Sequence, residues 1–258
     1  MHKIDLDLIE MTLDIMKYVI GRVSATEHLI GKPKKEEELK KLVGETITPK
    51  GVGGEYAFNL WKEHLADANV PVDHPRNLAF VPASPTKAAI MFDLITSASS
   101  IHGSYWMEGA GGIFCENEAM RWMVSLTGMP EGAFGVFTSG GTTANLSAIV
   151  TAREHWRENP EFQGEKGLII TSIGAHSSIK AMAKVADVDI LLVDSEERLT
   201  GEDLKKAIND LTAHQRKRLF AVVATAGTTN AGIIDQLDTI AEVCQQENLW
   251  FHVDAAYG

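Results

Sequence analysis

Short apolar runs alternate with amphipathic stretches through the second half of the chain, and this alternation restricts the fold more than any other feature. Five runs predict strands: residues 135–138, 167–172, 189–193, 219–225 and 249–254. The stretches around and between them predict helices: residues 86–99, 116–128, 143–156, 177–186, 201–211 and 234–247. Strands that alternate with helices form a largely parallel sheet covered by helices on both faces. The sequence therefore predicts an α/β fold.

The first 85 residues lack this alternation and predict helices and loops. Six apolar residues spaced by three and four predict one helix with an apolar stripe: Leu6, Ile9, Leu13, Met16, Ile20 and Val23. The stripe fits packing on the chain's own core, which the pattern alone favours, or a helix–helix contact with a second subunit. We expect an N-terminal segment over residues 1–85 and a larger domain over residues 86–258.

Composition excludes several classes of function. The formal net charge of −11 and the absence of a basic cluster interleaved with aromatics argue against a nucleic-acid partner. No apolar run reaches the roughly 18 to 20 residues that cross a bilayer, and the acidic N-terminus is unlike a secretory signal, so we expect a cytoplasmic protein. Cys115 and Cys244 form no CxxC pair and are expected to be packing residues.

Ligands of parallel sheets lie beyond the carboxyl ends of the strands. At the first such end, Gly140, Gly141 and Thr142 lead directly into a predicted helix. Glycines and a helix N-terminus suit a phosphate group, because backbone N–H groups and the helix dipole face the ligand. An ordinary turn with Thr142 or Thr143 as the helix cap is an equally good interpretation. The stretch is neither a Walker A loop nor a dinucleotide fingerprint.

Three further strand ends carry polar or small residues. His176 stands between a strand and a helix, where a capping or surface role is the ordinary interpretation. Thr228 lies in a turn of small residues, 226–229, that could leave room for a flat ligand. Asp254 ends the last strand, and a buried carboxylate is costly unless a cation pairs with it. A helix cap or a salt bridge to an arginine is the ordinary interpretation. Together the four ends describe pyridoxal phosphate, with Asp254 facing the protonated ring nitrogen.

The segments "FTSGGTTANLSAI", "AHSSIKAM", "VVATAGTTNAGIID" and "HVDAAYG" resemble signature segments of the group II pyridoxal-phosphate-dependent amino-acid decarboxylases. This family includes the aromatic-amino-acid, glutamate and histidine decarboxylases. The similarity extends upstream through "DHPRNLAFVPASPT" and "ENEAMRWMVSLTGMP", so it covers most of the chain from about residue 70. It implies the large domain of the aspartate-aminotransferase-like fold, called fold type I, over residues 86–258.

The resemblance also implies roles for single residues. Gly141 and Thr142, with Gly140 beside them, match the positions that hold the cofactor phosphate. His176 matches the histidine that stacks on the cofactor ring and meets the substrate carboxylate. Thr228 matches a threonine near the polar edge of the ring.

Two residues at the last strand complete the implied site, and two more line the substrate pocket. Asp254 matches the acid paired with the pyridinium nitrogen, so His176 and Asp254 are the expected catalytic residues. Ala256 matches the small residue against the opposite ring face. Phe80 and Pro82 lie in a segment that matches a substrate-pocket loop, where the aromatic decarboxylases carry Tyr at the position of Phe80. No metal ligand is expected.

The implied activity is decarboxylation of an L-amino acid to its amine by a homodimer. Aldehyde synthases and carbon–carbon lyases of the same family are alternatives, as are a non-catalytic fragment that binds cofactor or partner and a generic phosphate-binding module. The family's Schiff-base lysine lies in a Ser/Asp-x-His-Lys segment beyond the strand that matches "HVDAAYG". We therefore expect this chain to be an N-terminal portion that lacks that lysine and the C-terminal small domain. A missing C-terminal portion or a second chain is expected to complete the sheet.

Overall fold

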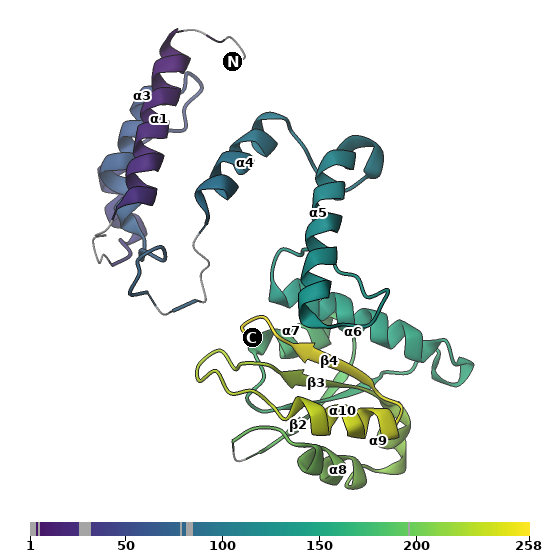
Figure 1. Cartoon of the computed structure of the whole chain (residues 1–258). Coiled ribbons are helices and arrows are strands. Elements are labelled where there is room, and N and C mark those ends of the chain that lie inside the picture. The colour runs from purple at the N-terminus through teal and green to yellow at the C-terminus, as the bar shows by residue number, and fades with distance from the viewer. Residues whose placement is uncertain (1–3, 5, 26–31, 78, 81–84, 196) are drawn as a thin grey trace. The chain divides into compact units, whose positions relative to one another are not determined.

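The computed structural model describes residues 4, 6–25, 32–77, 79–80, 85–195 and 197–258. Contacts divide the chain into two compact units, Met1–Ser104 and Tyr105–Gly258 (Figure 1). The division into two contact units lies later in the chain than the predicted domain boundary between residues 85 and 86, and that boundary stays a prediction. Each unit is described by itself.

The first unit is helical. Its elements are α1 (Leu6–Ser24), α2 (Glu36–Val43), α3 (Gly54–Leu60), the π-helical turn η1 (Trp61–Leu65), the 3-10 turn η2 (Ala66–Ala68) and α4 (Lys87–Ala98). Tyr18 of α1 packs edge-on against Phe58 of α3, with ring centroids 5.9 Å apart. Arg22, also on α1, donates from Nε to Asp73 Oδ2 over 2.7 Å. Within the described residues, no helix has both the length and the apolar character needed to cross a membrane.

The apolar stripe of α1 does not pack on the chain's own core. Five of its residues are exposed: Leu6, Ile9, Leu13, Ile20 and Val23. Tyr18 and Arg22 contact Phe58 and Asp73, and Ile20 and Val23 line a small cavity together with Ile90 and Met91 of α4. The own-core interpretation, which the pattern alone favours, is therefore wrong for Leu6, Ile9 and Leu13.

The second unit contains a four-stranded parallel sheet. Its strands are β1 (Leu168–Ser172), β2 (Asp189–Val193), β3 (Leu219–Thr225) and β4 (Trp250–Asp254), in the order β2-β1-β3-β4. Its helices are α5 (Trp106–Thr127), α6 (Gly141–Arg157), α7 (Ser177–Val185), α8 (Gly201–Asn209), α9 (Ala213–Arg218) and α10 (Leu237–Gln246), with a 3-10 turn, η3 (Pro160–Phe162). The predicted α/β class with a parallel sheet is confirmed.

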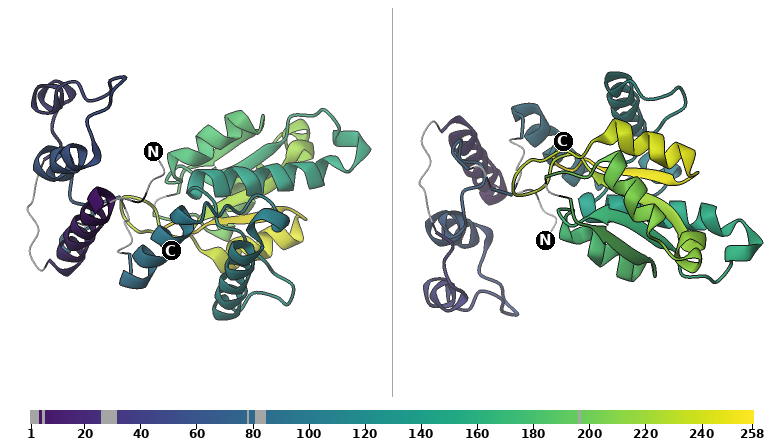
Figure 2. Two further views of the ribbon diagram at one scale, coloured as in Figure 1. Left: turned by 90° about the horizontal axis from the view of Figure 1, so that it is seen from above. Right: turned by 90° about the horizontal axis from the view of Figure 1, so that it is seen from below.

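Helices cover both faces of this sheet because alternate strand residues point to opposite sides. Ile169 of β1 packs with α6 and α7, whereas the next residue, Ile170, packs with α8 and α10. On β3, Val223 likewise packs with α6 and α7, and Val222 packs with α8 and α10. Figure 2 shows the two helical layers from above and below the view of Figure 1. Every residue of β1 and β3 is buried, which explains why both strands read as continuous apolar runs.

One predicted strand is wrong. Residues 135–138 form no strand, and the side chains of Val136 and Phe137 are 70% and 60% exposed. The amide of Phe137 donates to Glu116 Oε1 over 3.0 Å. A strand needs a neighbouring backbone to complete its hydrogen bonds, and here a glutamate side chain takes that place. The predicted helix at residues 116–128 begins earlier, at Trp106, and has non-helical dihedrals at Gly109.

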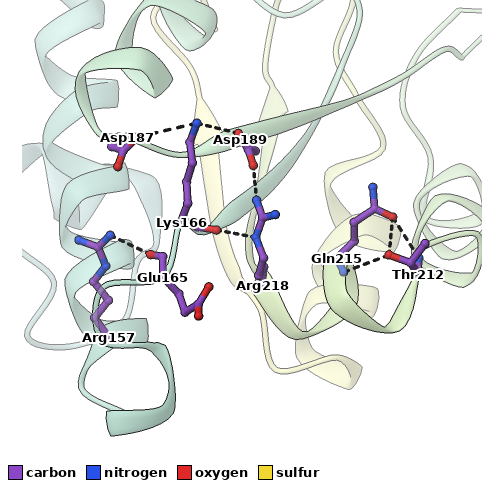
Figure 3. A network of polar contacts seen from close by, with 8 residues as sticks. All are labelled: Arg157, Glu165, Lys166, Asp187, Asp189, Thr212, Gln215 and Arg218. Atoms are coloured by element: carbon purple, nitrogen blue, oxygen red, sulfur yellow. Dashed lines mark hydrogen bonds and ion pairs between the residues drawn. The ribbon is translucent and has the colours of Figure 1, made fainter.

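A polar network joins the amino ends of β1, β2 and β3, opposite the strand ends where the site was predicted (Figure 3). Lys166 Nζ lies 2.9 Å from Asp189 Oδ1, and Arg218 pairs with the same carboxylate while its Nε donates to the Lys166 carbonyl over 2.6 Å. The hydrogen bond from Lys166 lowers the pKa of Asp189, and the same bond raises the pKa of Lys166. The network therefore joins the amino ends of three strands. The predicted site residues stand at the opposite, carboxyl ends.

Candidate functional site

Helix α6 begins without a side-chain cap. Gly140 occupies the N-cap position with φ at 150°, and its carbonyl accepts from the amides of Thr143 and Ala144 over 3.0 and 3.1 Å. The Thr143 hydroxyl lies 3.1 Å from the Ser139 hydroxyl instead of capping the helix. The interpretation with Thr142 or Thr143 as N-cap is therefore wrong. An uncapped helix start presents backbone N–H groups and the positive end of the dipole to an anion.

The start of α6 lies directly against the segment that follows β4. A Cβ atom built on Gly141 would be 3.2 Å from the Ala256 Cβ, closer than most Cβ contacts. A Cβ built on Gly227, which follows β3 with φ at 97°, would be 2.8 Å from the Tyr257 side chain. The two glycines thus permit close approach of three segments that are distant in sequence.

Asp254 is buried and is held by an amide. Its side chain belongs to a residue that is 7% exposed, and its Oδ2 accepts from Asn145 Nδ2 over 2.9 Å. Asn145 Oδ1 lies 2.7 Å from His252 Nε2. In the described part of the chain, no lysine or arginine forms an ion pair with Asp254. The helix-cap and arginine interpretations of Asp254 are therefore both replaced by a neutral amide donor.

His252 lies two residues before Asp254 on the same face of β4. Burial lowers the pKa of His252, and the charge of Asp254 opposes this shift. A neutral imidazole has one N–H, and a bond to the amide oxygen of Asn145 places that proton on Nε2. Three side chains on α6 and β4 consequently form one connected set of hydrogen bonds.

His176 and Thr228 line one cavity of about 530 Å³. His176 is also the N-cap of α7, because its Nδ1 accepts from the Ser178 amide over 3.2 Å. Thr228 Oγ1 accepts from the Ile233 amide over 3.1 Å. A Cβ built on Gly174 would lie 3.6 Å from Thr228 Cγ2, so the segments after β1 and β3 are neighbours. His176 therefore caps α7, as its ordinary interpretation predicts, and it also lies in the wall of a cavity.

The predicted site residues of the second unit thus gather at the carboxyl ends of the strands, but they do not all face the same cavity. Gly141, Asp254 and Ala256 do not line the cavity of His176 and Thr228. The loop of Phe80 belongs to the first unit, where Phe80 is 80% exposed with φ at 67°. Pro82 lies outside the described residues. The substrate-contact role of this loop stays a prediction.

Two polar residues at these strand ends were not singled out from sequence. Asn145 is 3% exposed, yet an asparagine inside an amphipathic helix carries no sign of its partner. Asp235 is 5% exposed and accepts from the amides of Leu199 and Thr225 over 2.8 and 2.7 Å. Burial raises the pKa of Asp235, and the two backbone bonds oppose the shift. Asp235 thereby ties the end of β3 to the segment before α8.

Comparisons with known proteins agree on one family. The model described as "Pyridoxal-dependent decarboxylase conserved domain" matches residues 59–258. The chain is 31% identical over 240 residues to the aromatic-L-amino-acid decarboxylase of Bacillus atrophaeus, and the alignment covers 90% of this chain and 49% of that protein. It is 32% identical over 238 residues to the cysteine sulfinic acid decarboxylase of Mus musculus, and that alignment covers 87% of this chain and 47% of the relative. The crystal structure of mouse CSAD in apo form superposes with a TM-score of 0.83 at 27% identity, over 98% of this chain and 56% of that one. The chain spans about half the length of the curated relatives it matches.

Proposed function

Because the chain belongs to the pyridoxal-dependent decarboxylase family, we propose that the complete protein removes the α-carboxylate of an L-amino acid as carbon dioxide and releases the amine. Pyridoxal phosphate is the cofactor of this family. The observation that carries the proposal is Asp254, a buried carboxylate whose side-chain partner is the neutral amide of Asn145. A carboxylate in such a position is costly unless a cation faces it, and a pyridinium nitrogen is such a cation.

Two observations support the fit of this cofactor to the residues present. The uncapped start of α6 at Gly140 and Gly141 suits a phosphate dianion. The close approach of Gly141 to Ala256 places that helix start beside the segment that follows Asp254. A phosphate site and a site for a ring nitrogen therefore adjoin each other, as the two ends of one small ligand require.

The proposed roles follow from the chemistry of each group. When bound, the cofactor supplies a sink for the electrons left on Cα after carbon dioxide departs. Asp254 would raise the pKa of the ring nitrogen and keep its proton in place. The helix start at Gly140, Gly141 and Thr142 would hold the phosphate through backbone N–H groups. These contacts would hold both ends of the ligand in place.

His176 and Thr228 would contact the cofactor and the substrate from the ends of β1 and β3. The Nδ1 atom of His176 accepts from the Ser178 amide, which leaves Nε2 to donate to the substrate carboxylate. Its imidazole would stack on the cofactor ring, opposite the Ala256 methyl group. Orientation of the ring decides which bond at Cα breaks, so stacking contributes to the choice of reaction. Thr228 would lie near the polar edge of the ring.

The test uses the whole protein that contains this chain. Carbon dioxide release is measured with aromatic L-amino acids and with cysteine sulfinic acid, the substrate classes named for the relatives. Asp254→Ala should lower turnover of the accepted substrate by about 100-fold or more, as expected when one preorganised electrostatic group is lost. Asp238→Ala removes an exposed carboxylate from the first turn of α10 and should leave turnover unchanged.

Three outcomes would contradict the proposal. Wild-type turnover in Asp254→Ala would remove the role given to that carboxylate. Calorimetry that shows tighter binding of nucleotides than of pyridoxal phosphate would favour the generic phosphate-binding module. Cofactor binding without carbon dioxide release from any amino acid would favour the non-catalytic alternative.

We also propose that the protein is a cytoplasmic homodimer in which the stripe on α1 contacts the second subunit. The exposed side chains of Leu6, Leu13 and Ile20 support this, because water-exposed apolar residues at helical spacing suit a helix–helix contact. Sedimentation of a variant that lacks residues 1–25 tests it. A folded variant that remains dimeric would contradict the role given to α1.

A further inference from the structure

The side-chain amide of Asn145 uses both of its ends in buried hydrogen bonds. Its Nδ2 donates to Asp254 Oδ2 over 2.9 Å and to Ser178 Oγ over 3.3 Å. Its Oδ1 lies 2.7 Å from His252 Nε2. A carboxylate only accepts hydrogen bonds, so the nitrogen of the amide must be the end that faces Asp254. The orientation of Asn145 is therefore fixed by its partners on α7 and β4.

We propose that Asn145 is a positioning residue that holds the Asp254 carboxylate toward the ring nitrogen of pyridoxal phosphate. The proposal rests on the function proposed above. An amide at this place has a property that lysine or arginine lacks, because it donates a hydrogen bond without neutralising the carboxylate. Asp254 is held in one rotamer while its negative charge remains available to a cationic ring nitrogen.

The remaining contacts of Asp254 leave capacity for that partner. Among the described residues, its Oδ1 accepts one hydrogen bond, a long one of 3.3 Å from the Ala256 amide. Each carboxylate oxygen offers about two lone-pair sites, so one bond to Asn145 and one to Ala256 do not exhaust them. The contact to the ring nitrogen is left to the lone pairs that these two donors do not use.

His252 supports Asn145 from the other end of the amide. Burial lowers the pKa of His252, which keeps the imidazole neutral with one N–H to donate. That N–H binds the amide oxygen, so the amide cannot rotate away from Asp254 without losing its hydrogen bonds to Asp254, Ser178 and His252. His252 thus holds the amide of Asn145 in place, and Asn145 in turn holds the carboxylate of Asp254.

The experiment compares two probes on the whole protein: pyridoxal phosphate and its 1-deaza analogue, in which a C–H replaces the ring nitrogen. Equilibrium binding is followed by tryptophan fluorescence or calorimetry. Asn145→Ala should weaken binding of pyridoxal phosphate by about tenfold to a hundredfold, the range for a hydrogen bond to a charged group. Binding of the 1-deaza analogue should change by less than about twofold, because no ring nitrogen faces Asp254. Thr151→Ala, an exposed substitution on the same helix, is the control and should change neither affinity.

The ratio of the two affinities is measured on a single preparation, so partial unfolding of a variant cancels from it. Asn145→Ser, which keeps a short donor, supplies a second variant and should give an intermediate ratio. Nitrogen NMR of His252 without cofactor gives a further readout, since loss of the amide acceptor should change its Nε2–H signal. An equal loss of affinity for both probes would show a merely structural role and overturn the proposal.

Failure of the proposed function gives a different result. If the wild-type protein binds pyridoxal phosphate and the 1-deaza analogue equally well, Asp254 does not contact the ring nitrogen at all. If the wild-type protein discriminates between them and Asn145→Ala discriminates equally well, only the role of Asn145 is overturned.

Discussion

Replacing Thr225 by valine should stabilise the protein. Thr225 ends β3 and is 3% exposed, and its hydroxyl has no hydrogen-bond partner among the described residues. Its backbone amide, which donates to Asp235 Oδ2, is untouched by the substitution. An unpaired buried hydroxyl costs about 1–3 kcal/mol, and valine has nearly the same shape. The free energy of unfolding of Thr225→Val should therefore rise by about 1–2 kcal/mol.

Thr171 on the neighbouring strand β1 provides a control of opposite sign. It is 1% exposed, and its hydroxyl donates to the Val223 carbonyl over 2.9 Å. Thr171→Val removes this bond and leaves a buried carbonyl with one partner fewer. The free energy of unfolding should fall by about 1 kcal/mol. The same chemical change in two adjacent strands is thus expected to have opposite effects.

Urea denaturation at neutral pH measures both variants. The slope with urea should match that of the wild type, because the surface exposed on unfolding is unchanged. A loss of stability in Thr225→Val comparable to that in Thr171→Val would refute the reasoning. It would mean that the Thr225 hydroxyl is hydrogen-bonded in solution.

Three further predictions concern titrating groups and thiols. Burial raises the pKa of Asp235 above its ordinary value of 3.8, so between the unfolded and the folded pKa the native state binds more protons than the unfolded chain. The stability of the wild type relative to Asp235→Asn should therefore fall as the pH rises from about 4, and urea titration measures it. The lowered pKa of Asp189 gives stability that is present above 3.8 and lost as pH falls through the folded pKa, so Asp189→Asn should flatten acid unfolding followed by circular dichroism. Burial raises the pKa of Cys244 to about 12, so a disulfide reagent should modify exposed Cys115 at once and Cys244 only after denaturant is added; rapid reaction of both in buffer would contradict this.

Local patterns in the sequence predicted much of the second unit. Four predicted strands correspond to β1 through β4, because runs of β-branched and other apolar residues between turn residues favour buried parallel strands. Helix α8 begins at Gly201, where the sequence predicts a helix start, and Thr200 and Asp203 form both hydrogen bonds of a capping box. The family and its cofactor, expected from four segments, are confirmed by the family match over residues 59–258.

The predictions that failed depended on distant partners. Residues 135–138 have the apolar composition of a strand, but their hydrogen bonds are decided by what lies beside them, and Glu116 takes the amide of Phe137. Cys115 was expected to pack in a core, yet it is exposed on α5, whereas Cys244 is buried as expected. Cysteine side chains are often buried in proteins, but the packing of the other elements decides whether a given cysteine is buried.

The sequence by itself determined which segments form strands and helices, and which small and polar residues stand at the strand ends, because these depend on dihedral preferences and on periods of 2 and 3.6 residues. Only the tertiary structure decided that Asn145 is the partner of Asp254, 109 residues away. That contact depends on the face that α6 turns toward β4, and the face is set by packing of Ile149 and Ala152 on the sheet. No local pattern in either segment encodes the hydrogen bond between them.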